Sequence, residues 1–345
     1  MSSVLENFSK PAMRTAPLAL LLTATLPFTA TALEGISFDH KDWILACDNT
    51  GTCRAAGYQE ENQPGLASLL LERRAGTNTQ VQASLKLGED AEFPTTVELH
   101  IGAQALGPIA LDHMGMGKPN PAQTRALLTA IKGTAAIELR ASDKTWTLSS
   151  SGANAVLLKM DEFQRRVGTT SALIRPGKQR GNPLLPQAAS VIYAAAVPQA
   201  APRTISPANA DYPQLQRLLG QALQEACFPE KDEPAPSFVV HALSDSRALI
   251  STTCWMAAYN HGDIYVLMDS DSRQVLKVLG SDFNDYANGV LSSSHKGRGL
   301  GDCWSTKEYV WDGQQFVLSL KQTTGLCRGF PGGAWELPTV VSEVR

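Results

Sequence analysis

Apolar and polar residues alternate with a period of two over several short stretches in the first half of the chain. In residues 96–101, Val97, Leu99 and Ile101 share one face, and His100 lies on the opposite, polar face. Alternation of this kind predicts a strand with one buried side. Further strands are predicted for residues 43–47, 52–58, 66–73, 80–87, 135–140 and 145–149.

Three stretches instead repeat their apolar residues at the spacing of a helix. Asn120, Pro121 and Gly133 are the residue types that begin and end a helix, and they flank the first stretch. The second runs from 153 to 167 and ends at Gly168, and the third covers 212–226. Helices among antiparallel strands predict an α+β fold.

The second half of the chain predicts a run of short antiparallel strands after the third helix. They cover 238–243, 248–259, 264–268 and 274–278. A hairpin follows, in which residues 308–311 and 315–320 flank Asp312-Gly313, a dipeptide that suits a tight turn. Short strands separated by polar turns predict an antiparallel meander.

Proline and alanine concentrate between these two regions, in residues 175–212. We therefore predict a signal peptide at 1–32, an N-terminal α+β domain at 33–174 and a Pro/Ala-rich linker at 175–212. A C-terminal domain of one helix and an antiparallel β-meander follows at 213–345. The predicted fold class is α+β, with two mainly antiparallel β domains, a few packed helices and stabilising disulfides.

The N-terminus has the features of a secretory signal. Lys10 and Arg14 precede the apolar run 16–28, and Ala30-Thr31-Ala32 suits cleavage before Leu33. The run is too short for a membrane span, and no later run is long enough. We expect a periplasmic or secreted protein.

The chain contains six cysteines, all of them after the predicted cleavage site. An even number in an exported chain favours disulfides. Six cysteines allow fifteen pairings, and sequence alone does not choose among them. Spacing suggests neighbouring pairs: Cys47 with Cys53, Cys227 with Cys254, and Cys303 with Cys327. No C-x-x-C motif indicates zinc, and we expect no metal and no cofactor.

The net charge is −3, and no basic run is present. We therefore expect no nucleic-acid partner and no electrostatic binding to anionic lipid. The oligomeric state is not predicted.

Catalytic chemistry has weak support in the sequence. No G-x-S-x-G elbow occurs, and the six histidines are scattered. His241 lies in an apolar strand and His261 in a turn. A buried, hydrogen-bonded histidine and an ordinary turn explain these two positions better than a catalytic role does. Catalytic residues stay unknown.

Two oxygen-rich stretches are weak candidates for calcium. The first, Asp269-Ser270-Asp271, lacks the glycine and terminal glutamate of a calcium loop. The second contains Asp282, Asn284, Asp285 and Asn288, without a matching spacing. A hairpin turn is the simpler explanation of the first stretch.

The strongest binding candidate surrounds the last two cysteines. Arginine and tryptophan are enriched at binding hot spots, because they combine a large contact area with directional polar groups. An alternative is that the tryptophans fill the core and an Arg298–Asp302 pair braces the loop. The candidate surface consists of Arg298, Asp302, Trp304, Trp311 and Arg328.

Three stretches resemble a known family. They are WILACDNTGTCRAAGY at 43–58, DEFQRRVGTTSALIRPG at 161–177, and GRGLGDC with YVWDGQQF and CRG near the end. Together with the signal peptide and six cysteines, they resemble the domain of unknown function 1176 family. The resemblance implies an exported Gram-negative bacterial protein and supplies no activity. Trp304 departs from it, because a small residue is expected after Gly-Asp-Cys.

Three hypotheses remain. The leading one is an exported envelope protein that binds an envelope protein or a cell-wall ligand without catalysis. The alternative is a periplasmic hydrolase of an envelope polymer, which requires His241 or His261 to meet a carboxylate in a cleft. The third is a purely structural or stress-related envelope factor. The sequence leaves enzyme activity uncertain and favours its absence.

Overall fold

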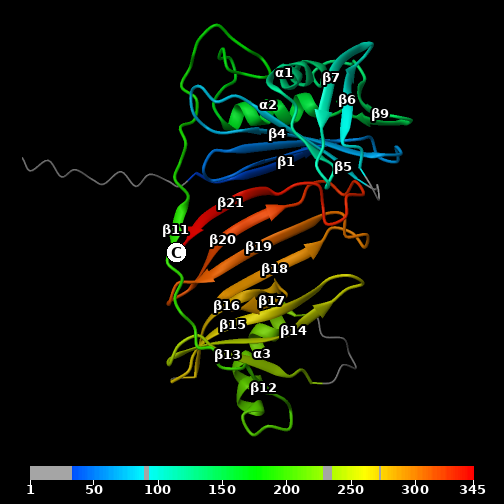
Figure 1. Ribbon diagram of the computed structural model, residues 1–345. Helices are drawn as coiled ribbons and strands as arrows, with labels where there is room; N and C mark the ends of the chain where they lie inside the picture. The colour runs from blue at the N-terminus through cyan, green and yellow to red at the C-terminus, as the bar shows by residue number, and fades with distance from the viewer. Residues whose placement is uncertain (1–32, 89–92, 228–234, 272) are drawn as a thin grey trace, which may run out of the picture. The chain divides into compact units, whose positions relative to one another are not determined.

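The computed structural model describes residues 33–88, 93–227, 235–271 and 273–345 (Figure 1). The predicted signal peptide at 1–32 lies outside these residues. The described strands form four sheets, and almost all neighbouring strands are antiparallel. Mainly antiparallel sheets with three helices are the fold class expected from the alternating pattern.

The first sheet contains six strands, with the first five in chain order. Consecutive strands can pair as neighbours because their polar turns are short. The alternating residues of β3, β4 and β5 put one apolar face inward. Its strands are β1 (Ile36–His40), β2 (Trp43–Cys47), β3 (Cys53–Tyr58), β4 (Leu66–Arg73), β5 (Gln82–Gly88) and β8 (Met116–Gly117).

The second sheet has the strand order β10-β9-β6-β7 and shares the largest apolar core with the first sheet. Two helices, α1 (Pro121–Ala130) and α2 (Ala153–Phe163), contribute Leu127 and Met160 to that core. Its strands are β6 (Thr96–Ile101), β7 (Gln104–Ala110), β9 (Ile137–Ala141) and β10 (Lys144–Leu148).

The helix ends differ in how well the sequence predicted them. Asn120 caps α1, as its residue type predicted, and it also forms a capping box with Gln123. Helix α2 was predicted to reach 167 but ends at Phe163. The physical reason is local, because Arg165 has a positive φ of 55° and the Gln164 side chain makes buried hydrogen bonds.

The predicted linker 175–212 contains two short strands. The first, β11 (Ser190–Ile192), pairs in parallel with β21 (Leu337–Val344). The second, β12 (Arg203–Ile205), pairs with β13 (Phe238–Ala242). Each strand therefore adds to the edge of a C-terminal sheet.

The C-terminal half forms a six-stranded and a five-stranded sheet. In the first the order is β11-β21-β20-β19-β18-β17, and in the second it is β12-β13-β14-β15-β16. Their remaining strands are β14 (Arg247–Met256), β15 (His261–Asp269), β16 (Gln274–Phe283), β17 (Asp285–Ala287), β18 (Val290–Lys296), β19 (Trp304–Trp311) and β20 (Phe316–Thr323).

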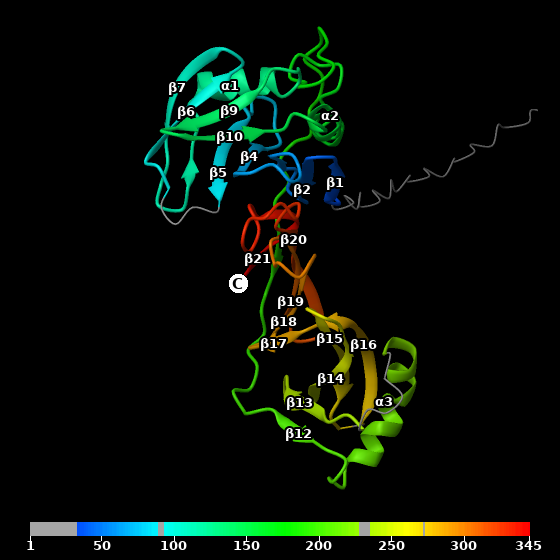
Figure 2. The same ribbon diagram turned by 90° about the vertical axis from the view of Figure 1, so that its right-hand side faces the viewer.

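Helix α3 (Tyr212–Ala226) packs on the five-stranded sheet next to β16 (Figure 2). Only Tyr212 and Leu219 of this helix are fully buried. The Cys227–Cys254 disulfide joins the end of α3 to β14. A separate core contains Leu249 of β14 with Trp311 and Phe316 of the six-stranded sheet.

A small core joins sequence-distant parts of the chain. Tyr58 and Leu66 of the first sheet pack with Phe330, Trp335 and Leu337. The Trp335 indole N–H donates to Ser68 Oγ at 2.7 Å. Residues 33–345 form one compact unit, and the predicted boundaries at 174 and 213 stay a prediction. Among the described residues no helix is long and apolar enough to cross a membrane.

Candidate functional site

The predicted surface lies at the loops that precede β19 and follow β20. The Cys303–Cys327 disulfide joins these two loops at the open end of the hairpin. At the other end, the Asp312 carboxylate accepts backbone N–H bonds from Gln314 and Gln315, both at 2.8 Å. Both ends of the hairpin are therefore fixed, and the loop 297–303 is held close to the sheet.

Arg298 and Asp302 form an ion pair across this loop. Arg298 Nε donates to Asp302 Oδ1 at 2.8 Å, and the Gly329 N–H donates to Asp302 Oδ2 at 2.6 Å. The Arg298 guanidinium holds the pKa of the buried Asp302 carboxyl below its usual range. This pair braces the loop, and Arg298 itself stays 40% exposed.

Arg328 points away from the open surface and toward the first sheet. Its Nη2 donates to Asp42 Oδ1 at 2.8 Å, and its Nη1 lies 3.4 Å from Glu61 Oε2. Its backbone oxygen accepts from Gln59 Nε2 at 2.9 Å. Only 10% of the side chain is exposed. Arg328 therefore fastens the disulfide loop to the turn before β2 and to the segment after β3.

The two tryptophans of β19 have different environments. The Trp304 indole N–H donates to the Gly301 oxygen at 2.9 Å, and Lys296 Nζ lies 5.4 Å from the centre of its ring. Trp311, at the opposite end of the strand, is 1% exposed and packs on Phe316. A binding surface at the disulfide therefore does not include Trp311, because this side chain fills the core.

Three exposed apolar residues that the sequence reading missed lie in this loop or at the β14–β15 hairpin end that contacts it. Leu300 is 78% exposed, Met256 is 78% exposed, and Tyr259 is 46% exposed. The Tyr259 ring lies beside Gly299, and Asn260 makes two hydrogen bonds with the backbone of Lys296. We call Met256, Tyr259, Arg298, Leu300 and Trp304 the Leu300 surface. No pattern in the sequence separates an exposed leucine from a buried one in a loop.

The candidate histidines are placed on separate strands. His241, on β13, packs edge-to-face on Tyr286 with ring centres 4.7 Å apart, and burial lowers its pKa. His261 begins β15 opposite Met256 and is exposed. Neither histidine makes an ion pair with a carboxylate of the described residues. His100 lies 3.6 Å from Glu98, on the polar side of β6.

The oxygen-rich stretches are engaged in internal contacts. Asp269 pairs with Arg247 at the β15–β16 turn, and its Oδ1 accepts the Asp271 N–H. Asp282 pairs with Lys307 at 2.7 Å, and the Asn284 amide bonds the Ser294 backbone. Asp302 lies close to Cys303 and Cys327, but these sulfur atoms are bonded to each other and offer no thiolate.

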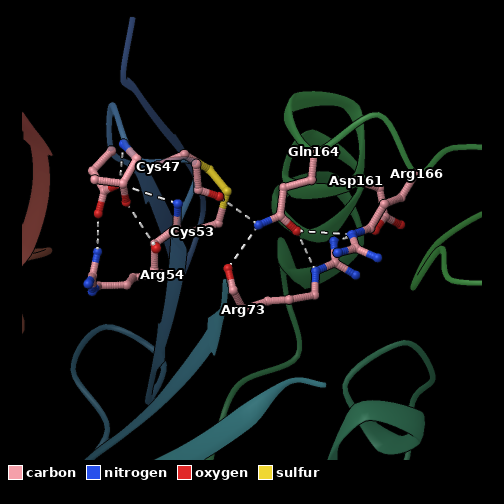
Figure 3. The surroundings of a disulfide bond; sticks show 11 residues. Cys47, Cys53, Arg54, Arg73, Asp161, Gln164 and Arg166 are labelled. Carbon is pink, nitrogen blue, oxygen red and sulfur yellow. Dashed lines mark hydrogen bonds and ion pairs between the residues drawn. A yellow bond between two sulfur atoms is a disulfide. The ribbon is translucent and has the colours of Figure 1, made fainter. Parts of the chain in front are cut away.

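A buried cluster of charges lies next to the Cys47–Cys53 disulfide (Figure 3). Arg73 Nη2 donates to Asp161 Oδ1 at 2.6 Å, and the Gln164 side-chain oxygen accepts from both Arg73 and Arg166. The Gln164 amide group points the other way, to the Gly51 oxygen at 2.9 Å. All four side chains are almost fully buried. The cluster therefore joins the start of the segment 161–177 to the first sheet.

This cluster was not recognised as a unit in the sequence. Asp161, Gln164 and Arg166 belong to one of the stretches that carry the family resemblance, but Arg73 lies 88 positions from Asp161. Arg166 also donates to Thr79 Oγ1 at 2.8 Å, and burial lowers its pKa to about 10. Since every polar group has a protein partner, we assign the cluster a structural role.

Comparison with known proteins identifies a family and a relative, both without an assigned function. A family model described as a protein of unknown function (DUF1176) matches residues 37–342. The chain is 28% identical over 346 residues to an uncharacterised protein, YpfG, of Escherichia coli K12, covering 91% of this chain and 94% of that protein. No solved structure matches.

Proposed function

We propose a function on the premise that the chain belongs to the DUF1176 family of proteins of unknown function. The proposed molecule is an exported envelope protein that binds another envelope protein and catalyses no reaction. Its binding site is the Leu300 surface. The observation that carries the proposal is the exposure of Leu300, in a loop that a disulfide and the Arg298–Asp302 ion pair hold in place, and of Met256, at the end of β14.

Export is supported by the cysteines. All six are paired in three disulfides, and such bonds persist in oxidising compartments. The sequence of residues 1–32 adds the features of a secretory signal. We therefore propose the periplasm or the extracellular space as the location.

The composition of the Leu300 surface supports a protein partner. Methionine, aromatic residues and arginine are the types enriched in the centre of protein interfaces. The loop that carries Leu300 and Arg298 is already ordered, so binding would lose little conformational entropy there. A polymer hydrolase needs a base and a carboxylate that converge. His241 and His261 lie on separate strands, and neither forms an ion pair with a carboxylate of the described residues. The binding function is therefore better supported than the hydrolase alternative.

Affinity capture with matched variants tests the proposal. The oxidised chain from Leu33 onward would be tagged and incubated with an envelope extract of the source organism. We expect a stoichiometric protein partner with the wild type. In a Leu300→Ser/Met256→Ser variant, capture should fall at least about tenfold, because each exposed anchor contributes about 1–2 kcal/mol.

Leu185→Ser is the control, since Leu185 is also exposed, at 62%, but lies outside the Leu300 surface. Thermal melting of all variants would check that they fold equally well. The proposal is wrong if the wild type captures no stoichiometric protein, or if the double variant captures it as well as Leu185→Ser does.

A further inference from the structure

The outer edge of β5 is only partly paired. On its inner side, β5 pairs with β4 along its whole length, from Gln82 to Gly88. On its outer side, the two-residue strand β8 pairs only with Leu85 and Lys86, and the Leu87 N–H donates to the Gly115 oxygen at 3.0 Å. No described strand pairs with the outer side of Gln82–Ser84.

The direction of the free groups follows from strand geometry. Backbone groups of alternate residues in a strand point to the same side. Since the Leu87 N–H points outward, the N–H and C=O of Ala83 point outward as well. An extended β8 would place Pro119 opposite Ala83. Proline has no N–H to donate, and the chain turns there into α1 at Pro121. Proline therefore explains why this edge stays open.

A groove of about 720 Å³ follows the open edge. Residues 80–84, which include the free edge, line this groove together with residues of α1 and the segment near Leu173. Leu128 and Leu173 make part of the lining apolar. A groove beside an open strand edge is the geometry used for strand addition, in which a peptide backbone forms the ladder bonds.

The charge of the groove is positive. Lys118 and Arg125 line it, are exposed, and make no ion pair with a described residue. Glu72 also lines it but is paired with Arg54, with Nε and Oε2 3.0 Å apart. The buried Arg73 forms part of the wall. Acidic side chains next to Lys118 and Arg125 would therefore be favoured.

We propose that this groove binds an extended segment of a partner polypeptide, with alternating acidic and apolar side chains, as an added strand on β5. The outward N–H and C=O of Ala83 select a polypeptide over a sugar polymer, because a polypeptide backbone carries the complementary C=O and N–H groups at strand spacing. The site is separate from the Leu300 surface, so either proposal can fail without the other.

A labelled heptapeptide of alternating glutamate and valine is the probe. We expect saturable binding to the full oxidised chain by fluorescence anisotropy, and slower hydrogen exchange at residues 81–84 in the complex. Lys118→Glu/Arg125→Glu should weaken binding about tenfold or more, because both changes replace attraction with repulsion. Lys321→Glu is the control, since Lys321 is an exposed lysine of β20.

Two further peptides separate backbone pairing from charge. The same peptide N-methylated at alternate residues should bind at least about tenfold more weakly, because it lacks donors for the ladder. A lysine–valine peptide should not bind. The proposal is overturned if the probe shows no saturable binding at about 1 mM, if the methylated peptide binds equally well, or if the double charge variant behaves like Lys321→Glu.

Discussion

Two buried arginines and one buried carboxylate lie in the cluster next to the first disulfide. Asp161 accepts from Arg73 and from the Ile174 N–H at 2.7 Å, and its side chain is fully buried. Burying a charge without a partner is costly, so removing the only carboxylate of the described cluster leaves two uncompensated cations.

Asp161→Asn should therefore lower the free energy of unfolding by about 3–5 kcal/mol. Urea unfolding followed by tryptophan fluorescence would measure the change. Lys159→Ala, on the same helix, removes an exposed ion pair with Glu162 and should cost at most about 0.5 kcal/mol. Equal effects of the two substitutions would contradict the role assigned to the cluster.

Asp302 gives a prediction about pH. Its folded pKa lies below that of an unfolded aspartate, about 3.9, because Arg298 stabilises the charged form. The contribution of this group to stability is thus fully present above that value and is lost as the pH falls through the folded pKa. The difference in stability between wild type and Asp302→Asn should shrink when the pH is lowered from 6 to 3. Denaturant unfolding at both pH values would measure it, and a constant difference would contradict the prediction.

Gly325 is a position where only glycine fits. Its φ is +103°, and an added Cβ would lie 1.9 Å from the Tyr58 hydroxyl. Gly325→Ala should therefore cost about 1–3 kcal/mol through overpacking and backbone strain. Gly332→Ala is the control, because Gly332 has a φ of +74° but no atom within 4 Å of the added Cβ. Thermal unfolding should show the larger loss for Gly325→Ala, and adding Tyr58→Phe should restore part of it.

At the scale of single elements, α3 depends on its disulfide. Few of its side chains are fully buried, and Cys227–Cys254 closes a segment with a sequence separation of 27. The chain-entropy model gives roughly 3–4 kcal/mol for a loop of that length. In Cys227→Ser/Cys254→Ser, hydrogen exchange should become faster in α3 than in β19 and β20. Uniform acceleration across the chain would contradict a local role.

The elements show what the sequence could and could not predict. The hairpin that joins Cys47 to Cys53, and the capped start of α1, depend on neighbouring residues, which the sequence displays directly. Strands β18 and β21 were not predicted, because their alternation is weak. Strand β18 forms by pairing with β19, and β21 forms by pairing with β20, so both depend on residues outside the strand itself. Similarly, Trp304 and Trp311 belong to one strand, but only tertiary packing decides that Trp311 is buried.

At the scale of the whole molecule, the first sheet depends on distant residues. Its outer face, with Ile44, Tyr58 and Leu66, is covered by residues 330–337. A fragment of residues 33–174, the predicted N-terminal domain, would expose this apolar face. We expect it to bind a hydrophobic dye such as ANS and to aggregate, whereas residues 33–345 should not. Dye fluorescence and light scattering at equal concentration would measure this, and a monomeric fragment that does not bind the dye would contradict it.

The same long-range contacts affect the order in which the structure can be completed. The Asn49 side chain, in the turn between β2 and β3, makes two hydrogen bonds with the backbone of Val341, 292 positions later in the chain. These bonds cannot form until Val341 has left the ribosome and, if the chain is exported, has crossed the membrane. The hairpin of β2 and β3 is thus synthesised long before β21, and its contacts with β21 form only when the chain is nearly complete. During that interval its apolar face needs shielding, so we expect slow maturation and a dependence on chaperones that hold unfinished chains.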